Sequence, residues 1–347
     1  MTSALLIAYV YLINLFSKPD KGARFIATTF ISIVCACILF LSDSKDFKNY
    51  FNFYETLTST NLSFSWIEPG FLLLALLFKN FDFSFQVFIG VILTISLIAK
   101  LYFITKYSRQ PEISFIFYVS FFLLLHESTQ IRVSIAITFL MFSIYSMSNL
   151  RYLHSLMWIA LATMFHYSSI TFVGLILLKM ILSKGIIQYR TLLIGSVFIL
   201  VLIGAFGGIG MKFVNSITTV FPTLAFAEKL ILYSGLADSV FNPLLNVKSL
   251  FVLFNCVLIL YLLPRIEPTA LEVMSIFSLI ISLACFFVLS DFEVLAVRLG
   301  ELFLFPIIFI LPMYTKLLKQ EGIAVMLLIL CSAVFSLYYL ISLGFLV

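Results

Sequence analysis

Residues 126–169 read HESTQIRVSIAITFLMFSIYSMSNLRYLHSLMWIALATMFHYSS, and this stretch decides the fold. Two apolar runs flank a basic turn near residue 150, and Arg132 and His166 each lie about 17 residues from that turn. An α-helix rises about 1.5 Å per residue, so two antiparallel helices bring these two side chains to nearly the same depth. Alone, an arginine or histidine at a helix end is most often an interface residue whose charge reaches water. A pair brought level by one helical hairpin indicates a shared polar site.

The composition of the whole chain excludes a soluble globular protein. Of 347 residues, 63% are hydrophobic and 11% are charged, and the mean hydropathy is +1.16, whereas soluble chains carry about 25% charged residues. Apolar stretches long enough to cross a bilayer recur from end to end. We therefore expect an all-α polytopic membrane protein with about twelve transmembrane helices. The predicted spans are 2–16, 24–41, 83–104, 112–126, 130–148, 151–166, 168–183, 190–206, 247–263, 268–289, 298–314 and 322–343.

A thirteenth apolar piece, 69–79, is too short to cross. Its Glu68-Pro69 start fits a helix, because proline suits the first helical turn. About eleven residues cover only part of a hydrocarbon core of roughly 30 Å. The pattern predicts a re-entrant or interfacial helix.

The distribution of basic residues sets the orientation, since cytoplasmic loops hold the excess of lysine and arginine. One set of loops, with Lys100 counted in it, carries 13 basic and 5 acidic residues, and the opposite set holds 8 basic and 11 acidic residues. The first set, at a net charge of +8 against −3, is expected in the cytoplasm, with both termini outside. The chain is expected to form one integral membrane domain, 1–347, with outer loops 42–68 and 207–246. The second loop predicts a flexible joint at 207–210 and an interfacial helix at 225–233.

With this orientation, conspicuous polar residues gather at or near the outer boundary. Charge near the membrane interior is costly and usually faces a cavity or a partner. One alternative is that these residues are scattered interface anchors, and that Arg298 and Glu301, three apart on one helix face, merely pair with each other. We favour a polar cavity open to the outside. Its residues are Glu68, Glu127, Gln130, Arg132, His166, Arg298 and Glu301.

The residue types in this cavity suit phosphate and proton chemistry. Arginine presents a planar fork of donors that matches phosphate oxygens, so two arginines could stabilise a departing pyrophosphate. A histidine, neutral often enough near pH 7, could take a proton from a hydroxyl. No Asp-x-Asp, His-Glu-x-x-His or paired-cysteine metal motif occurs, and the five cysteines sit in apolar runs as packing residues. Walker and Gly-x-Ser-x-Gly motifs are also absent, which disfavours an ATP-driven pump and a serine hydrolase.

At this point the sequence resembles the EpsG family of Wzy-like polysaccharide polymerases. The likeness covers roughly residues 40 to 315, and the order and spacing of short motifs carry it. The resemblance implies a GT-C-like glycosyltransferase bundle that joins lipid-linked oligosaccharide repeat units on the outer side of the bacterial cytoplasmic membrane. The motifs are an acidic, tyrosine-bearing outer loop (Asp46, Tyr50, Tyr54), Glu68-Pro69-Gly70-Phe71, Gln130-Ile131-Arg132, Phe165-His166-Tyr167-Ser168, and Arg298 opening a late span that ends near Leu311-Pro312.

The expected reaction transfers a growing glycan from undecaprenyl pyrophosphate to the terminal hydroxyl of one lipid-linked repeat unit, forming O-antigen, capsule or exopolysaccharide. We expect Arg132 and Arg298 to contact pyrophosphate, and His166 to act as base with Glu68 as its substitute or helper. Partners are expected to be the lipid-linked oligosaccharide, membrane lipid, a chain-length regulator and a flippase, with no nucleic acid and no cofactor. Candidate substrate-binding residues are Glu127, Gln130, Glu301, Tyr50, Tyr54 and Tyr167.

Two other classes of protein share parts of this pattern. A flippase or transporter for the same lipid-linked sugar would carry polar residues through the midplane and show helix breaks or two-fold repeats. The predicted span centres are nearly uncharged and no repeat is visible. An envelope O-antigen ligase or acyltransferase would share the outer cavity, and the sequence leaves that alternative open.

Overall fold

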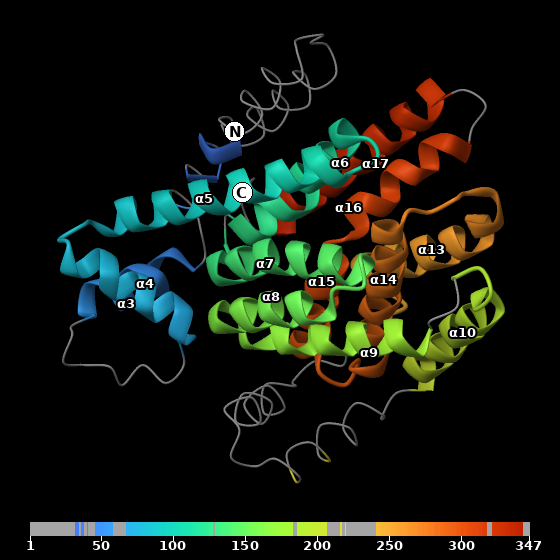
Figure 1. Ribbon diagram of the computed structural model, residues 1–347, viewed down its shortest axis with the longest axis horizontal. Coiled ribbons are helices and arrows are strands. Elements are labelled where there is room, and N and C mark those ends of the chain that lie inside the picture. The colour runs from blue at the N-terminus through green and yellow to red at the C-terminus, as the bar shows by residue number, and fades with distance from the viewer. Residues whose placement is uncertain are drawn as a thin grey trace. The chain divides into compact units, whose positions relative to one another are not determined.

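The apolar runs of the sequence form helices in the computed structural model, which describes residues 46–57, 67–127, 129–182, 186–206, 241–317 and 321–342, with a few single positions elsewhere. No strand occurs in these ranges. The helices are α3 (Phe47–Thr56), α4 (Pro69–Asn80), α5 (Phe85–Tyr107), α6 (Pro111–Phe117), the π-helix η1 (Tyr118–Glu127), α7 (Ile131–Ser148), α8 (Tyr152–Phe165), the 3-10 helix η2 (Tyr167–Phe172), α9 (Val173–Ile181), α10 (Arg190–Phe206), α13 (Val247–Leu262), η3 (Leu263–Arg265), α14 (Ala270–Val288), α15 (Glu293–Leu304), α16 (Ile307–Ile310), η4 (Leu311–Leu317) and α17 (Glu321–Ser342) (Figure 1).

From residue 83 onward, every predicted span coincides with a helix or a run of helices to within five residues. The 69–79 piece is a helix as expected, α4, and its 12 residues rise only about 18 Å. The predicted spans 2–16 and most of 24–41, the joint at 207–210 and the interfacial helix at 225–233 lie outside the described residues.

Five of the described helical runs are long and apolar enough to cross a membrane, by length and composition. They are 85–107, 131–148, 247–265, 270–288 and 293–315. Four shorter apolar helical segments, 69–80, 152–165, 167–181 and 190–206, accompany them. The protein is therefore a multi-pass, all-helical membrane protein, and the total of twelve crossings and the GT-C-like arrangement stay predictions.

The chain divides into two compact units. Unit 1 comprises Met1–Phe142, Met157–His166 and Leu311–Val347, and unit 2 comprises Ser143–Leu156 and Tyr167–Ile310. The single integral membrane domain expected from the sequence stays a prediction.

In unit 1, α3 and α4 lie beside the first half of α5, away from α6 (Figure 1). Their contact is largely aromatic: Tyr54 stacks on Phe88, with ring centroids 5.1 Å apart, and Phe71 meets Phe88 at 5.5 Å. Buried aromatic rings contribute large apolar areas and fixed packing geometry. This cluster fixes the beginning of α4, where Glu68 lies. Because α3 falls inside the predicted outer loop 42–68, it is a helix that the sequence did not predict.

In unit 2, α14 packs against α9, α10, α13, α15 and α16. Serines of α14 bind across to the neighbouring backbone, since Ser278 and Ser282 each donate to a carbonyl oxygen of α15 at 2.7 Å. Gly300 allows this approach, because a Cβ there would lie 2.5 Å from the Phe286 ring. Small and hydroxyl-bearing residues at helix contacts are typical of membrane bundles.

The turn between α7 and α8 is closed by a helix C-cap. Arg151 N–H donates to the Ser146 carbonyl at 2.9 Å and Leu150 N–H to the Met147 carbonyl at 3.0 Å, while Leu150 adopts a φ of 59°. This pattern of bonds around a left-handed residue is the Schellman arrangement that ends helices. A turn of three residues, 149–151, leaves the two arms of the hairpin nearly equal in length, as the sequence predicts.

Two sequence expectations are corrected. Lys100 is counted above with the cytoplasmic loop charges, although it falls inside the predicted span 83–104. The structure places it within α5 and buries it, since it is 1% exposed. Removing Lys100 from the loop count leaves that set at a net charge of +7, so the predicted orientation is unchanged. Arg298 does not open its helix, because α15 begins at Glu293, five residues earlier.

The predicted orientation is testable with single cysteines in a cysteine-free background. Cysteine at Asn52 or Leu245, both exposed, is expected to react with a membrane-impermeant thiol reagent in intact cells or spheroplasts. Cysteine at exposed Gln188 or Glu267 is expected to react only after permeabilisation. Labelling of the second pair alone in intact cells would invert the topology.

Candidate active site

Within unit 1, one carboxylate joins the arginine and the histidine of the hairpin. Glu68 Oε2 accepts a hydrogen bond from Arg132 Nη1, and Glu68 Oε1 lies 3.8 Å from His166 Nδ1. The expectation that Arg132 and His166 lie at one level is therefore confirmed, because both contact the same side chain. The 3.8 Å separation is too long for a hydrogen bond, so the carboxylate acts on the imidazole through its charge.

The sequence Glu68-Pro69-Gly70-Phe71 explains how Glu68 reaches this position. Pro69 is the first residue of α4, where the backbone N–H that proline lacks would have no partner within the helix. Glu68 lies just before the helix in an extended conformation. A Cβ on Gly70 would lie 2.9 Å from the Met164 carbonyl oxygen, two residues before His166. The start of α4 therefore abuts the end of α8, and only glycine permits that approach. Phe71, fully buried, holds the helix start against the aromatic cluster.

Tyr50 of α3 fixes the other side of the Arg132 guanidinium. Arg132 Nε donates to the Tyr50 hydroxyl at 3.3 Å, and its Cζ lies 5.6 Å from the centre of the Tyr50 ring. Burial raises the pKa of the Tyr50 hydroxyl above its ordinary value, while Arg132 acts in the opposite sense. The phenol therefore stays neutral near pH 7 and serves as a hydrogen-bonding support. Arginine carries five N–H donors, so these two bonds leave three for a ligand.

Arg132, His166 and Glu68 differ in how far their side chains are exposed, and this difference indicates two roles. Arg132 and His166 are 24% and 17% exposed at their side chains, whereas Glu68 is 2% exposed. A substrate can therefore reach the arginine and the histidine, while the carboxylate stands behind them. Burial of Glu68 favours its helper role over that of a substitute base, because a general base must reach the proton it removes.

A second polar cluster of unit 1 surrounds Glu127. Glu127 is completely buried, and its Oε1 accepts hydrogen bonds from Lys100 Nζ, from the Tyr118 hydroxyl and, at 3.0 Å, from the Ser134 hydroxyl. Lys100 Nζ also donates to Ser134 at 2.8 Å. Ser134 lies two residues after Arg132, so the ion pair fastens the first turn of α7 to α5 and η1.

The π-helix η1 makes this cluster possible. Tyr118 and Glu127 are nine residues apart, at its two ends. At 3.6 residues per turn nine residues make two and a half turns, which puts the side chains on opposite faces. The i→i+5 bonding of a π-helix gives roughly 4.4 residues per turn, so nine residues make about two turns and both side chains share a face. π-Helical segments are rare, and most are single-turn bulges inside α-helices, often at functional sites.

The other predicted substrate-binding residues differ in burial and in the element that carries them. Gln130 precedes α7 and is half-buried. Tyr54 is buried and donates its hydroxyl to the Phe83 carbonyl at 2.7 Å, which is a packing role. Tyr167 begins η2 in unit 2 and is half-buried.

The predicted pair on α15, in unit 2, has different surroundings for its two members. Glu301 is buried and accepts a hydrogen bond from Lys248 Nζ of α13. Arg298 is exposed. The lysine partner was missed by sequence reasoning, as was Lys100. An intramembrane lysine is itself a signal of a polar partner. Lys100 was counted with the loop charges although it falls inside the predicted span 83–104, so this signal was not used.

Among the described residues, no group of three or more histidine, cysteine, aspartate or glutamate side chains is placed to hold a metal ion. Comparison with known protein families finds the EpsG family, which matches residues 23–345. No curated protein and no solved structure matches the chain. The family match covers nearly the whole sequence, both units included.

Proposed function

Because the chain belongs to the EpsG family, we propose that it polymerises lipid-linked oligosaccharide repeat units into a surface polysaccharide, on the outer face of the bacterial cytoplasmic membrane. The family is one of glycosyltransferase-like polysaccharide polymerases. The observation that carries the finer proposal is the Glu68 carboxylate held between Arg132 and His166. It supports a site that handles a proton and an anionic leaving group side by side.

In the proposed reaction, the terminal hydroxyl of the acceptor repeat unit attacks the anomeric carbon of the donor glycan. The new C–O bond forms as the bond from that carbon to the pyrophosphate oxygen breaks. His166 takes the hydroxyl proton, and undecaprenyl pyrophosphate leaves with the electron pair of the broken bond. No metal is needed in this scheme, because guanidinium groups neutralise the charge on the pyrophosphate.

Glu68 is proposed as a positioning residue. Its charge favours the protonated imidazole that forms when His166 accepts the proton, since an opposite charge within about 4–6 Å stabilises a cation. The same carboxylate, with Tyr50, holds the guanidinium of Arg132 in one orientation. Donors fixed before the reaction cost no reorganisation in the transition state.

Arg298 is proposed as the second pyrophosphate-binding arginine. It is exposed on α15, one helical turn before Glu301, which is buried and paired with Lys248. Glu127 is completely buried, so its carboxylate cannot contact a sugar. It is proposed to hold the first turn of α7, and hence Arg132, in place through its hydrogen bond with Ser134. Gln130 and Tyr167, both partly exposed, stay candidates for sugar contact.

Arg132→Lys tests the proposal. Lysine keeps the positive charge beside Glu68 but loses the fork of donors. We expect polymerisation to fall roughly 10–100-fold, the cost of one or two hydrogen bonds to a charged group, with accumulation of unpolymerised lipid-linked repeat units. Polymer length on gels, lipid-linked intermediates and protein abundance are measured together.

Arg151→Lys, at an exposed arginine of the α7–α8 turn, is the matched control and is expected to leave polymerisation unchanged. Arg298→Lys is expected to act as Arg132→Lys does. Wild-type polymer from both Arg132→Lys and Arg298→Lys would remove pyrophosphate binding by these arginines.

A further inference from the structure

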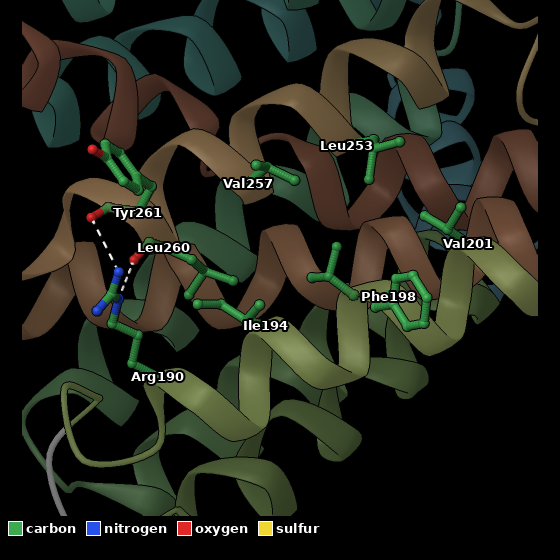
Figure 2. Close-up of a pocket in the computed structure, with 9 residues that line it drawn as sticks. Arg190, Ile194, Phe198, Val201, Leu253, Val257, Leu260 and Tyr261 are labelled. Carbon is green, nitrogen blue, oxygen red and sulfur yellow. Dashed lines mark hydrogen bonds between the residues drawn. The ribbon is translucent and has the colours of Figure 1, made fainter.

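Unit 2 carries an apolar groove between α10 and α13 that the proposed reaction does not use. The groove holds about 460 Å³, within the range of ligand sites in proteins. Figure 2 shows Arg190 and Tyr261 at one end of the groove and Val201 toward the other. Between them, its walls are aliphatic and aromatic side chains, including Ile194, Val197, Phe198, Leu253 and Val257. Several of these side chains are strongly exposed, among them Phe198 at 63% and Val257 at 54%.

The polar end of the groove depends on Pro264, which frees a backbone carbonyl at the end of α13 for Arg190 to bind. Pro264 lacks an N–H group, so the carbonyl of Leu260, four residues earlier, cannot receive the usual α-helical hydrogen bond from that position. Arg190 Nε donates to that carbonyl at 2.7 Å, and Arg190 Nη2 lies 3.5 Å from the Tyr261 carbonyl (Figure 2). The arginine thereby caps the end of α13, where the helix dipole favours a cation. Three of its five N–H groups remain for another acceptor.

A second guanidinium stands at the same end. Arg265, exposed in η3, has its Cζ 5.8 Å from the centre of the Tyr261 ring. Tyr261 therefore lies in contact with both arginines, through its carbonyl and through its ring. Two cations at the mouth of an apolar groove are complementary to an anionic group that carries a hydrocarbon chain.

The length of the groove selects among such ligands. From Arg190 to Val201, eleven residues rise roughly 16 Å, about half of a hydrocarbon core of roughly 30 Å. A groove of this length matches one leaflet, and its arginines lie at the end that the charge distribution predicts to be cytoplasmic. We propose that this groove binds an anionic glycerophospholipid of the inner leaflet, with an acyl chain along α10 and α13 and the phosphate at Arg190 and Arg265. Basic pockets between helices on the cytoplasmic side bind anionic headgroups in this way.

The test compares phosphatidylglycerol with phosphatidylcholine of the same acyl chains, by native mass spectrometry and by titration of the purified full-length protein in detergent. A membrane-surface arginine contributes about 1 kcal/mol toward an anionic lipid, or roughly 5-fold in affinity. We expect Arg265→Gln to weaken phosphatidylglycerol binding about 5-fold and Arg190→Gln with Arg265→Gln about 30-fold. Val257→Trp is expected to fill the groove and displace both lipids from it.

Arg151→Gln and Ile95→Trp, at exposed positions outside the groove, are the matched controls and should not change binding. If Arg190→Gln fails to fold because α13 loses its cap, Arg265→Gln and Val257→Trp still decide the question. Equal retention of the two phospholipids by the wild type, or unchanged binding in Arg265→Gln and Val257→Trp, would overturn the site. Preference for a polyprenyl phosphate over phosphatidylglycerol would overturn its assignment to a phospholipid.

Discussion

Replacing His166 with alanine is expected to lower the rate of polymerisation by about 10²–10⁴-fold, the usual effect of losing an acid–base group. The protein should remain folded and in the membrane, because His166 is partly exposed and follows the last residue of α8 without filling the core. The measurement is the rate of glycan elongation from lipid-linked repeat units at matched protein abundance. His154→Ala, at an exposed histidine on the same helix, is the matched control and should elongate normally.

Glu68→Gln separates proton transfer from positioning. The amide keeps the size of the side chain and an oxygen for Arg132, but removes the charge 3.8 Å from His166. A positioning role predicts that the elongation rate rises with pH at a higher pH in wild type than in Glu68→Gln. The Glu68 carboxylate stabilises the protonated imidazole of His166, which cannot act as a base until it loses that proton. Normal elongation by His166→Ala would make that histidine an interface residue and would leave the proposed base without support.

Replacing Lys100 with methionine is expected to destabilise the protein by about 3–5 kcal/mol, because it leaves Glu127 charged and unpaired in the interior. Methionine matches the lysine stem in shape, so the loss reports the missing charge and not a cavity. Thermal unfolding of purified protein, followed by fluorescence-detected size exclusion after heating, measures the change. Lys106→Met, at an exposed lysine near the end of the same helix, is the matched control and should have little effect.

The double change Lys100→Met with Glu127→Gln tests the cause. Glutamine removes the unpaired charge and keeps an oxygen acceptor for Tyr118 and Ser134. Replacement of both members of a buried pair is often neutral, so most of the stability lost in Lys100→Met should return. A double variant as unstable as the single one would show that Lys100 acts through something other than its ion pair.

Helix positions were predictable from the sequence because apolar periodicity and span length are local properties. The hairpin geometry was predictable for the same reason. Counting residues on either side of one turn is enough to bring Arg132 and His166 to the same height along the two helices. The partners of the polar residues were not predictable in this way. Arg132 meets Glu68 across 64 positions and Glu301 meets Lys248 across 53, and helical rise says nothing about which distant helices become neighbours.

Two features of the site were missed for identifiable physical reasons. Lys100 lies inside the predicted span 83–104 but was counted with the cytoplasmic loop charges, because a lone lysine near a span end usually reaches the interface. Its partner Glu127, which offsets the cost of burying the charge, lies 27 positions away in sequence. The shared face of Tyr118 and Glu127 was missed because it depends on π-helical rather than α-helical periodicity. The apolar pattern of residues 118–127 does not distinguish the two helix types.

The central claim is that this protein joins repeat units while they are attached to their lipid carrier. Its most direct test is reconstitution of the purified protein with undecaprenyl-pyrophosphate-linked repeat units, followed by mass spectrometry of the lipid-linked products. We predict a ladder of glycans of two, three and more repeat units on one carrier, with release of one undecaprenyl pyrophosphate for each bond formed. Repeat units that cross the bilayer unchanged, or that move to a different acceptor without lengthening, would contradict the claim.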